Sequence, residues 1–243
     1  MMSIKSLGFL GERRAVALLL LGFYTSIFFI TGIALGGAWV KCFVALAATY
    51  GVAFFGLAAG YFWARWFAMG LGTSGLTMAM LGLMTQGWNT GIAVWGAMHA
   101  LIYLPLLGHR MADQYENQQG WRQRFNLDDY GVARVKRAVH GAATALPTMI
   151  FYTLAPKQDQ AAMLGLLLLT SIGVFGLLRM RFWGVLTLAG AGVWALVSAG
   201  GNVAAAGCCF SSTHALVGLL AALFIGMAVT PFIGPALRQL RER

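Results

Sequence analysis

Charge is scarce in this chain. Aspartate and glutamate together supply only 7 of its 243 residues, and all charged residues together supply 10%. Hydrophobic residues make up 59%, and the mean hydropathy is +0.74. A soluble domain of this length needs a polar surface, so the composition argues against one and indicates a protein whose solvent is lipid.

Carboxylates are absent from every long apolar run. The acidic residues are Glu12, Asp113, Glu116, Asp128, Asp129, Asp159 and Glu242. Ion-coupled transporters and intramembrane metallo- or aspartyl proteases need a buried carboxylate, so the sequence disfavours these classes. Retinal attachment needs a lysine deep in a helix, whereas Lys41 and Lys157 lie at the ends of apolar runs. The sequence therefore favours a protein without enzymatic activity.

What the chain does contain is long uncharged runs. A bilayer hydrocarbon core is about 30 Å thick, and a helix needs roughly 20 apolar residues to cross it. The runs cover 15–36, 42–63, 67–86, 90–108, 138–156, 160–178, 182–202 and 213–236. We therefore predict an all-α fold, a polytopic transmembrane helix bundle with about eight spans.

The 17 lysine and arginine residues are distributed unevenly about these runs. If the N-terminus is cytoplasmic, only Lys41 and Lys157 lie on the outer side, as the positive-inside rule requires. This predicts a bacterial-type inner (plasma) membrane protein with both termini in the cytoplasm. The net charge of +10 then reflects topology and attraction to lipid head groups, and no nucleic-acid partner is needed to explain it.

The two halves of the chain resemble each other. Phe55-Gly56-Leu57, Phe62-Trp63, Gly70 and Gly72 recur 120 residues later as Phe175-Gly176-Leu177, Phe182-Trp183, Gly190 and Gly192. Arg14-Ala15-Val16 matches Arg137-Ala138-Val139, and His99-Ala100-Leu101 matches His214-Ala215-Leu216. We infer a parallel duplication of a four-helix unit, because each half holds an even number of spans.

This duplication divides the chain into three parts. Residues 1–108 form a first four-helix membrane unit and residues 138–243 a second. Residues 109–137, rich in Gln, Asn, Asp and Arg, form a cytoplasmic linker with the start of an interfacial helix. Asp128 is placed to cap that helix, and Asp129 lies in its first turn.

His99 lies well within a predicted span, and His214 is its repeat equivalent. Together with Asn89, these residues are candidates for an intramembrane polar or ligand site. Axial haem ligation by the two histidines is one alternative. The other is that His99 is a single histidine hydrogen-bonded to a neighbouring helix.

The only three cysteines do not form a disulfide framework. Cys42, Cys208 and Cys209 with His214 offer thiolates and an imidazole on the predicted outer face, a donor set that suits copper(I) or zinc. Their spacing matches no metal signature. One alternative is a disulfide of Cys42 with Cys208 or Cys209 in an oxidising periplasm. The other is that these are small apolar residues packed in a loop.

Glycine supplies 32 residues, several of them at small-xxx-small spacing. Such positions let transmembrane helices approach closely, and they predict helix packing or self-association. The candidates are Gly32, Gly36, Gly56, Gly60, Gly70 and Gly72.

Three functions fit these observations. The first is a non-catalytic structural or assembly subunit of a membrane complex, which would have other membrane subunits as partners. The second is a permease or channel for a small neutral solute. The third is a metal- or haem-handling membrane protein, with copper, zinc or haem as its cofactor.

Overall fold

The computed structural model describes the backbone of residues 4–155, 160–205 and 213–241, and this part of the chain is helical without a strand. The all-α prediction is therefore confirmed. Eight long helices carry the fold: α1 (Ile4–Leu35), α2 (Val40–Ala59), α3 (Ala64–Gln86), α4 (Thr90–Tyr103), α7 (Asp129–Leu154), α8 (Gln160–Leu178), α9 (Phe182–Ala205) and α10 (Thr213–Arg241). The short helices are η1 (Gly37–Trp39), η2 (Leu104–Leu106), α5 (His109–Glu116) and α6 (Gln119–Phe125).

Each long helix overlaps one predicted span, yet not every helix is apolar enough to cross a membrane by itself. Within the residues described, five stretches pass that test: Gly11–Leu35, Gly37–Ala59, Ala64–Gln86, Phe182–Gly201 and Leu216–Pro235. A sixth is added if α4 with η2 and α5, which meet at a 71° bend, form one broken span. Several helices can thus cross a membrane, and the count of eight is not confirmed.

Helix α7 is not among these stretches, and it lies in the interior of the bundle. Every residue from Gly141 to Ile150 is buried, so the helix is enclosed on all sides by protein. It packs on α2, α3, α8 and α10. A helix that faces other helices instead of lipid tolerates small and polar residues such as Thr144 and Thr148, because their hydroxyls bond to backbone carbonyls.

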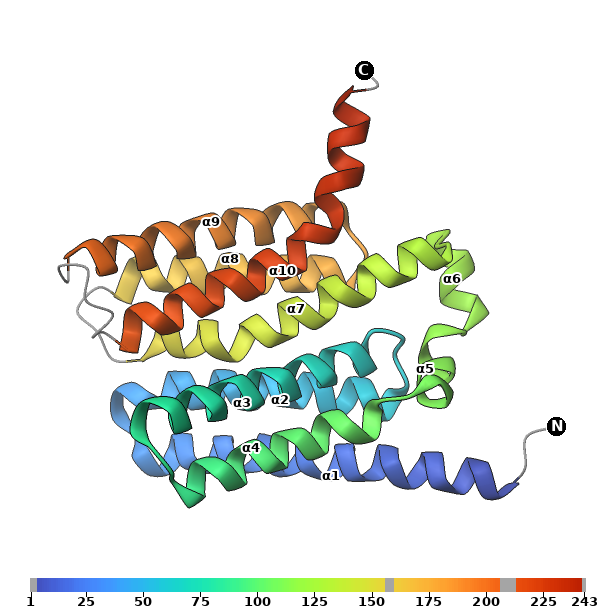
Figure 1. The fold of residues 1–243 in the computed structure, drawn as a ribbon, viewed down its shortest axis with the longest axis horizontal. Helices are drawn as coiled ribbons and strands as arrows, with labels where there is room; N and C mark the ends of the chain where they lie inside the picture. Colours follow the sequence, from blue (N-terminus) through green and yellow to red (C-terminus); the bar gives the residue numbers. More distant parts are fainter. Residues whose placement is uncertain (1–3, 156–159, 206–212, 242–243) are drawn as a thin grey trace.

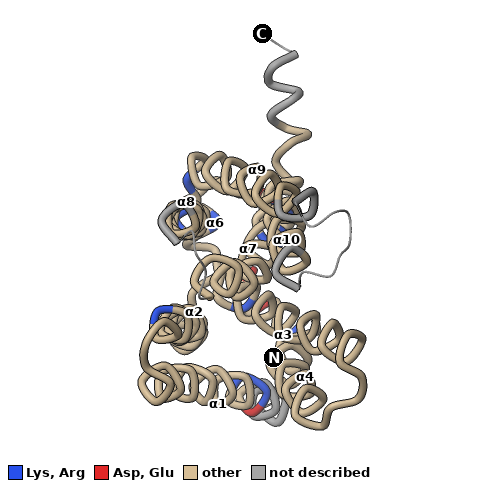
Figure 2. The backbone as a smooth tube through the Cα atoms, turned by 90° about the vertical axis from the view of Figure 1, so that its left-hand side faces the viewer, with Lys and Arg blue, Asp and Glu red and all other residues tan. Residues whose placement is uncertain are grey.

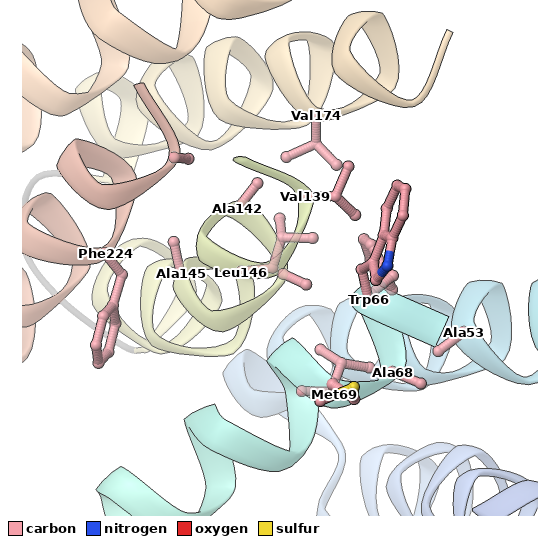
Figure 3. Packing of buried hydrophobic residues seen from close by; sticks show 14 of the residues in the cluster. Ala53, Trp66, Ala68, Met69, Val139, Ala142, Ala145, Leu146, Val174 and Phe224 are labelled. Atoms are coloured by element: carbon pink, nitrogen blue, oxygen red, sulfur yellow. The ribbon is translucent and has the colours of Figure 1, made fainter. Parts of the chain in front are cut away.

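The long helices form two groups of four (Figures 1 and 2). In the first, α1 packs on α2, α2 on α3 and α3 on α4, and α4 closes the ring on α1. Helices α7 to α10 close a second ring in the same order. The two groups meet mainly where α3 crosses α7, and Figure 3 shows Trp66 and Met69 of α3 on the side of α7 that carries Val139 and Leu146.

The crossing of α3 and α7 depends on Gly70. A Cβ atom at position 70 would lie 2.5 Å from the carbonyl oxygen of His140 and 2.6 Å from Cβ of Ala143. The hydroxyl of Thr144 donates to the carbonyl oxygen of Gly70 at 3.1 Å. The two backbones are therefore nearly in contact, and a larger residue at position 70 would separate the two groups.

Two turns show the same backbone at the repeat positions. In the α2–α3 turn, the amides of Gly60 and Tyr61 donate to the carbonyls of Leu57 and Gly56. In the α8–α9 turn, Met180 and Arg181 donate to Leu177 and Gly176. Both turns pass through a left-handed residue, with φ of 73° at Gly60 and 56° at Met180. Such paired bonds end a helix by satisfying its last carbonyls.

The segment 109–137, predicted as a linker, is folded against the bundle. Helices α5 and α6 lie at the end of the molecule near the N-terminus of α1 (Figure 1), and their residues Met111, Tyr115 and Trp121 are buried. The ring of Trp121 stacks on Phe62 at a centroid distance of 4.4 Å. Asp128 caps α7 as predicted, because its side chain accepts from the amide of Gly131 at 2.6 Å.

Candidate functional site

His99 is completely buried among aromatic side chains of the first group. Its Nε2 atom lies 2.8 Å from the hydroxyl of Tyr50, and its Nδ1 atom lies 3.0 Å from the hydroxyl of Tyr24 and 2.9 Å from the carbonyl oxygen of Trp95. The ring also lies against the rings of Tyr24 and Trp95, at centroid distances of 4.4 and 4.6 Å.

The hydrogen bonds define the state of this imidazole. The carbonyl of Trp95 can only accept, so Nδ1 carries the proton and Nε2 accepts from Tyr50. Both ring nitrogens are thus engaged, and no lone pair remains for a metal or haem iron in this arrangement. The geometry matches the alternative of a histidine hydrogen-bonded to neighbouring helices.

Gly75 provides the space that His99 occupies. A Cβ atom at position 75 would lie 1.9 Å from Cδ2 and 2.1 Å from Cγ of His99. The imidazole therefore rests directly on the backbone of α3. Gly70 and Gly72 of this helix were predicted packing positions, but no sequence pattern indicated that Gly75 faces the histidine.

Asn89 lies away from His99. It caps α4, where its side-chain oxygen accepts from the amide of Ile92 at 3.1 Å. Asn89 precedes His99 by ten residues, which corresponds to a distance of about 15 Å along the helix axis. Cys42 is a buried free thiol in the first turn of α2. Cys208, Cys209 and the side chain of His214 lie outside the described residues.

A metal site is not assembled in the described part of the chain, where no group of three His, Cys, Asp or Glu side chains could hold an ion. Of the predicted set of Cys42, Cys208, Cys209 and His214, all but Cys42 lie outside the described residues, His214 by its side chain.

The predicted packing glycines divide into two kinds. Gly32 approaches Phe43 of α2, Gly56 approaches Trp63, and Gly72 approaches Tyr103 and the carbonyl of His99, each within 3.1 Å of an added Cβ atom. Gly70 forms the α3–α7 crossing described above. Gly36 and Gly60 have φ of +62° and +73° and no atom within 4 Å, so they lie in turns where a left-handed backbone favours glycine.

Sequence reasoning missed a charged cluster around Glu116, which we call the clamp. Its Oε1 atom accepts from Arg65 Nη1 at 2.6 Å, Trp66 Nε1 at 2.9 Å and Lys136 Nζ at 3.1 Å. The Arg65 side chain is only 4% exposed, and its Nε atom donates to the carbonyl of Leu106 at 2.8 Å. One carboxylate of α5 therefore joins α3 of the first group to α7 of the second.

Further arginines bind helix ends on the same side. Arg14 donates to the carbonyls of Leu57 and Ala58 at 2.8 and 2.6 Å, and Arg13 donates to the carbonyl of Leu107. A guanidinium near the last carbonyls of a helix satisfies orphan acceptors and opposes the negative end of the helix dipole. The basic residues counted for topology therefore also have structural partners.

Two open clefts flank the contact between the groups. One, of about 1130 Å³, is lined by the α2–α3 turn, α6 and the α8–α9 turn, and we call it the arginine cleft. The other, of about 660 Å³, is lined by residues that include Tyr103, Lys136, Arg137 and His140. His140 Nε2 lies 3.2 Å from the hydroxyl of Thr73. His99 lines neither cleft.

Comparison with known protein families, with curated proteins and with solved structures finds no match for this chain.

Proposed function

We propose that this chain is a non-catalytic structural or assembly subunit of a membrane complex. It crosses a bacterial-type inner membrane with eight spans, α1 to α4 and α7 to α10, related by parallel duplication, and its two ends are cytoplasmic. The matching α2–α3 and α8–α9 turns support the duplication. The gathering of Arg13, Arg14, Arg65 and Lys136 at one end supports the orientation.

The clamp is the observation that carries this proposal. A transporter that alternates between two open states must move one half against the other. Here the two groups are in backbone contact at Gly70, and Glu116 bonds to both of them through Arg65 and Lys136. Separating the two groups breaks the Glu116–Lys136 pair, whose lysine side chain is 42% exposed, so this pair contributes only about 0–1 kcal/mol. The close backbone contact of α3 and α7 at Gly70 therefore holds the groups together, and the Arg65–Glu116 pair fixes the carboxylate that bridges them. Two groups packed in this way suit a rigid scaffold.

The hydrogen bonds of polar groups inside the bundle also support a structural role. The hydroxyls of Thr25, Thr49 and Thr77 donate to the carbonyl four residues before them, at 2.8, 2.8 and 2.9 Å. His99 and Tyr50 bond to each other. A permease would use such polar groups to line a solute path, whereas here the threonine hydroxyls bond within their own helices and Tyr50 and His99 bond between α2 and α4.

Native mass spectrometry after extraction in a mild detergent tests the assembly role. We expect the chain to be released together with another membrane subunit or with further copies of itself. A strictly monomeric species without a partner, under conditions that preserve a known complex from the same membrane, would contradict the proposal.

The permease alternative has one observation in its favour, the 660 Å³ cleft that contains His140. Proteoliposomes that hold the purified chain provide the test. We expect no faster osmotic swelling with small neutral solutes than in protein-free liposomes, and solute-dependent swelling would favour the permease.

A further inference from the structure

The arginine cleft brings together two kinds of side chain. The α2–α3 turn contributes Tyr61 and Trp63, whose rings stack at 5.6 Å, and α6 contributes Trp121. The α8–α9 turn contributes Arg179 and Arg181, and α6 adds Arg124. The walls of the cleft are therefore aromatic and cationic. The cleft lies at the end of the molecule that holds the α2–α3 and α8–α9 turns.

No carboxylate of the described residues balances the positive charge of this cleft. Its lining contains no aspartate or glutamate. The ion pairs of the described chain use Arg65, His109, Arg122 and Lys136, so none of the three cleft arginines has a carboxylate within 4 Å there. Arg179 lies over the ring of Phe175 at 5.1 Å, which holds its guanidinium without neutralising it.

The turn does not need these arginines. The α2–α3 turn has the same hydrogen bonds and left-handed residue, and it carries Ala59 and Tyr61 where the other turn carries Arg179 and Arg181. One backbone thus accepts either pair of side chains. The two cations are therefore not required by the backbone of the turn.

The cleft continues into an apolar groove of about 700 Å³ along α2. Val52, Ala59, Tyr61 and Trp63 line both spaces. The groove reaches from Ala59 to Val44, which is about 22 Å at 1.5 Å of rise per residue. A leaflet is half of the roughly 30 Å hydrocarbon core, so the groove is long enough for one acyl chain.

We propose that the arginine cleft binds the head group of an anionic diacyl phospholipid, with one acyl chain in the groove along α2. Arg179, Arg181 and Arg124 contact the phosphate oxygens, which suit the planar guanidinium donors. Tyr61, Trp63 and Trp121 lie at the boundary between head group and chain, where amphipathic rings are favoured. This site rests on the proposal that these helices cross a bilayer, and it is independent of the assembly role.

Tryptophan fluorescence of the full chain in neutral detergent micelles tests the site, because Trp63, Trp121 and Trp183 line the cleft. Phosphatidylglycerol with brominated acyl chains is titrated in, with brominated phosphatidylcholine as the uncharged comparison. We expect saturable quenching by the anionic lipid at a lower mole fraction than by phosphatidylcholine. Removing two cations in Arg179→Gln/Arg181→Gln should weaken anionic lipid binding roughly thirty-fold.

The double variant Arg110→Gln/Arg134→Gln is the matched control, since it removes two charges outside the cleft and should leave the affinity unchanged. If the double cleft variant has a lowered unfolding midpoint, the single variant Arg181→Gln is tested in its place. Its affinity for phosphatidylglycerol should fall about five-fold.

Four results would overturn the site, three of them from the lipid titrations. These are equal affinities of wild type and cleft variants, equal losses in cleft and control variants, and equal quenching by the two lipids. Displacement of the lipid by millimolar inorganic phosphate would also overturn it, because the ligand would then be a free anion. A monomeric chain that still binds phosphatidylglycerol would remove the assembly role and leave this site in place.

Discussion

Gly75→Ala should destabilise the first helix group by forcing His99 out of its position. The added methyl group would lie 1.9 Å from Cδ2 of a ring held by Tyr24, Tyr50 and Trp95, so the ring cannot move without losing its partners. Overpacking costs about 1–3 kcal/mol, and loss of the two tyrosine hydrogen bonds about 1 kcal/mol each. The better helix propensity of alanine returns about 1 kcal/mol.

The expected net loss is therefore about 2–4 kcal/mol of unfolding free energy. Titration with a denaturing detergent, followed by tryptophan fluorescence and circular dichroism, measures it. Gly226→Ala is the control, because no atom lies within 4 Å of a Cβ at that exposed helical position, and it should raise the stability by up to about 1 kcal/mol through helix propensity alone.

A double-mutant cycle isolates the contact. His99→Ala removes the ring, so Gly75→Ala should then be neutral or slightly stabilising, with a coupling energy of at least about 2 kcal/mol. If Gly75→Ala leaves the wild type unchanged, or costs the same in both backgrounds, the argument that Gly75 exists to admit the imidazole is wrong.

Three further substitutions probe other parts of the structure. Glu116→Gln leaves Arg65 buried without a carboxylate and should cost about 3 kcal/mol in the same unfolding assay, with Glu116→Asp losing less; an unchanged stability would refute the clamp. Asn89→Ala removes the cap of α4 and should cost about 1 kcal/mol, seen as faster amide exchange in its first turn, whereas Asn89→Asp should retain protection. Met180→Gly relieves a left-handed backbone that Gly60 adopts freely in the other turn and should raise the stability by about 1 kcal/mol; a loss would contradict the equivalence of the two turns.

The positions of the long helices could be predicted because they depend on local composition. A run of about 20 uncharged residues must be helical in lipid, where each backbone group needs a partner within its own segment. The number of spans could not be fixed in the same way. Helix α7 holds Thr144, His140 and Thr148, and its position at the centre of the bundle depends on four other helices.

The candidate site was predicted only in part. His99 was recognised because an ionisable residue within an apolar run is rare, but its partners Tyr24 and Tyr50 lie 75 and 49 residues away along the chain. Glu116 was assigned to a linker, since neither its neighbours nor its spacing indicated Arg65. Contacts between distant segments depend on how helices are rotated about their axes, which hydropathy does not define.

The sequence by itself determined that this chain is helical and that several of its helices are apolar enough to cross a membrane, because helix formation and hydropathy depend on local composition. Tertiary structure decided the roles of its few polar groups. It enclosed His99 between two tyrosines, joined the two helix groups through Glu116, and left Arg124, Arg179 and Arg181 facing an open cleft. A polar side chain in such a protein is defined by its neighbours, and only the packing of the helices selects them.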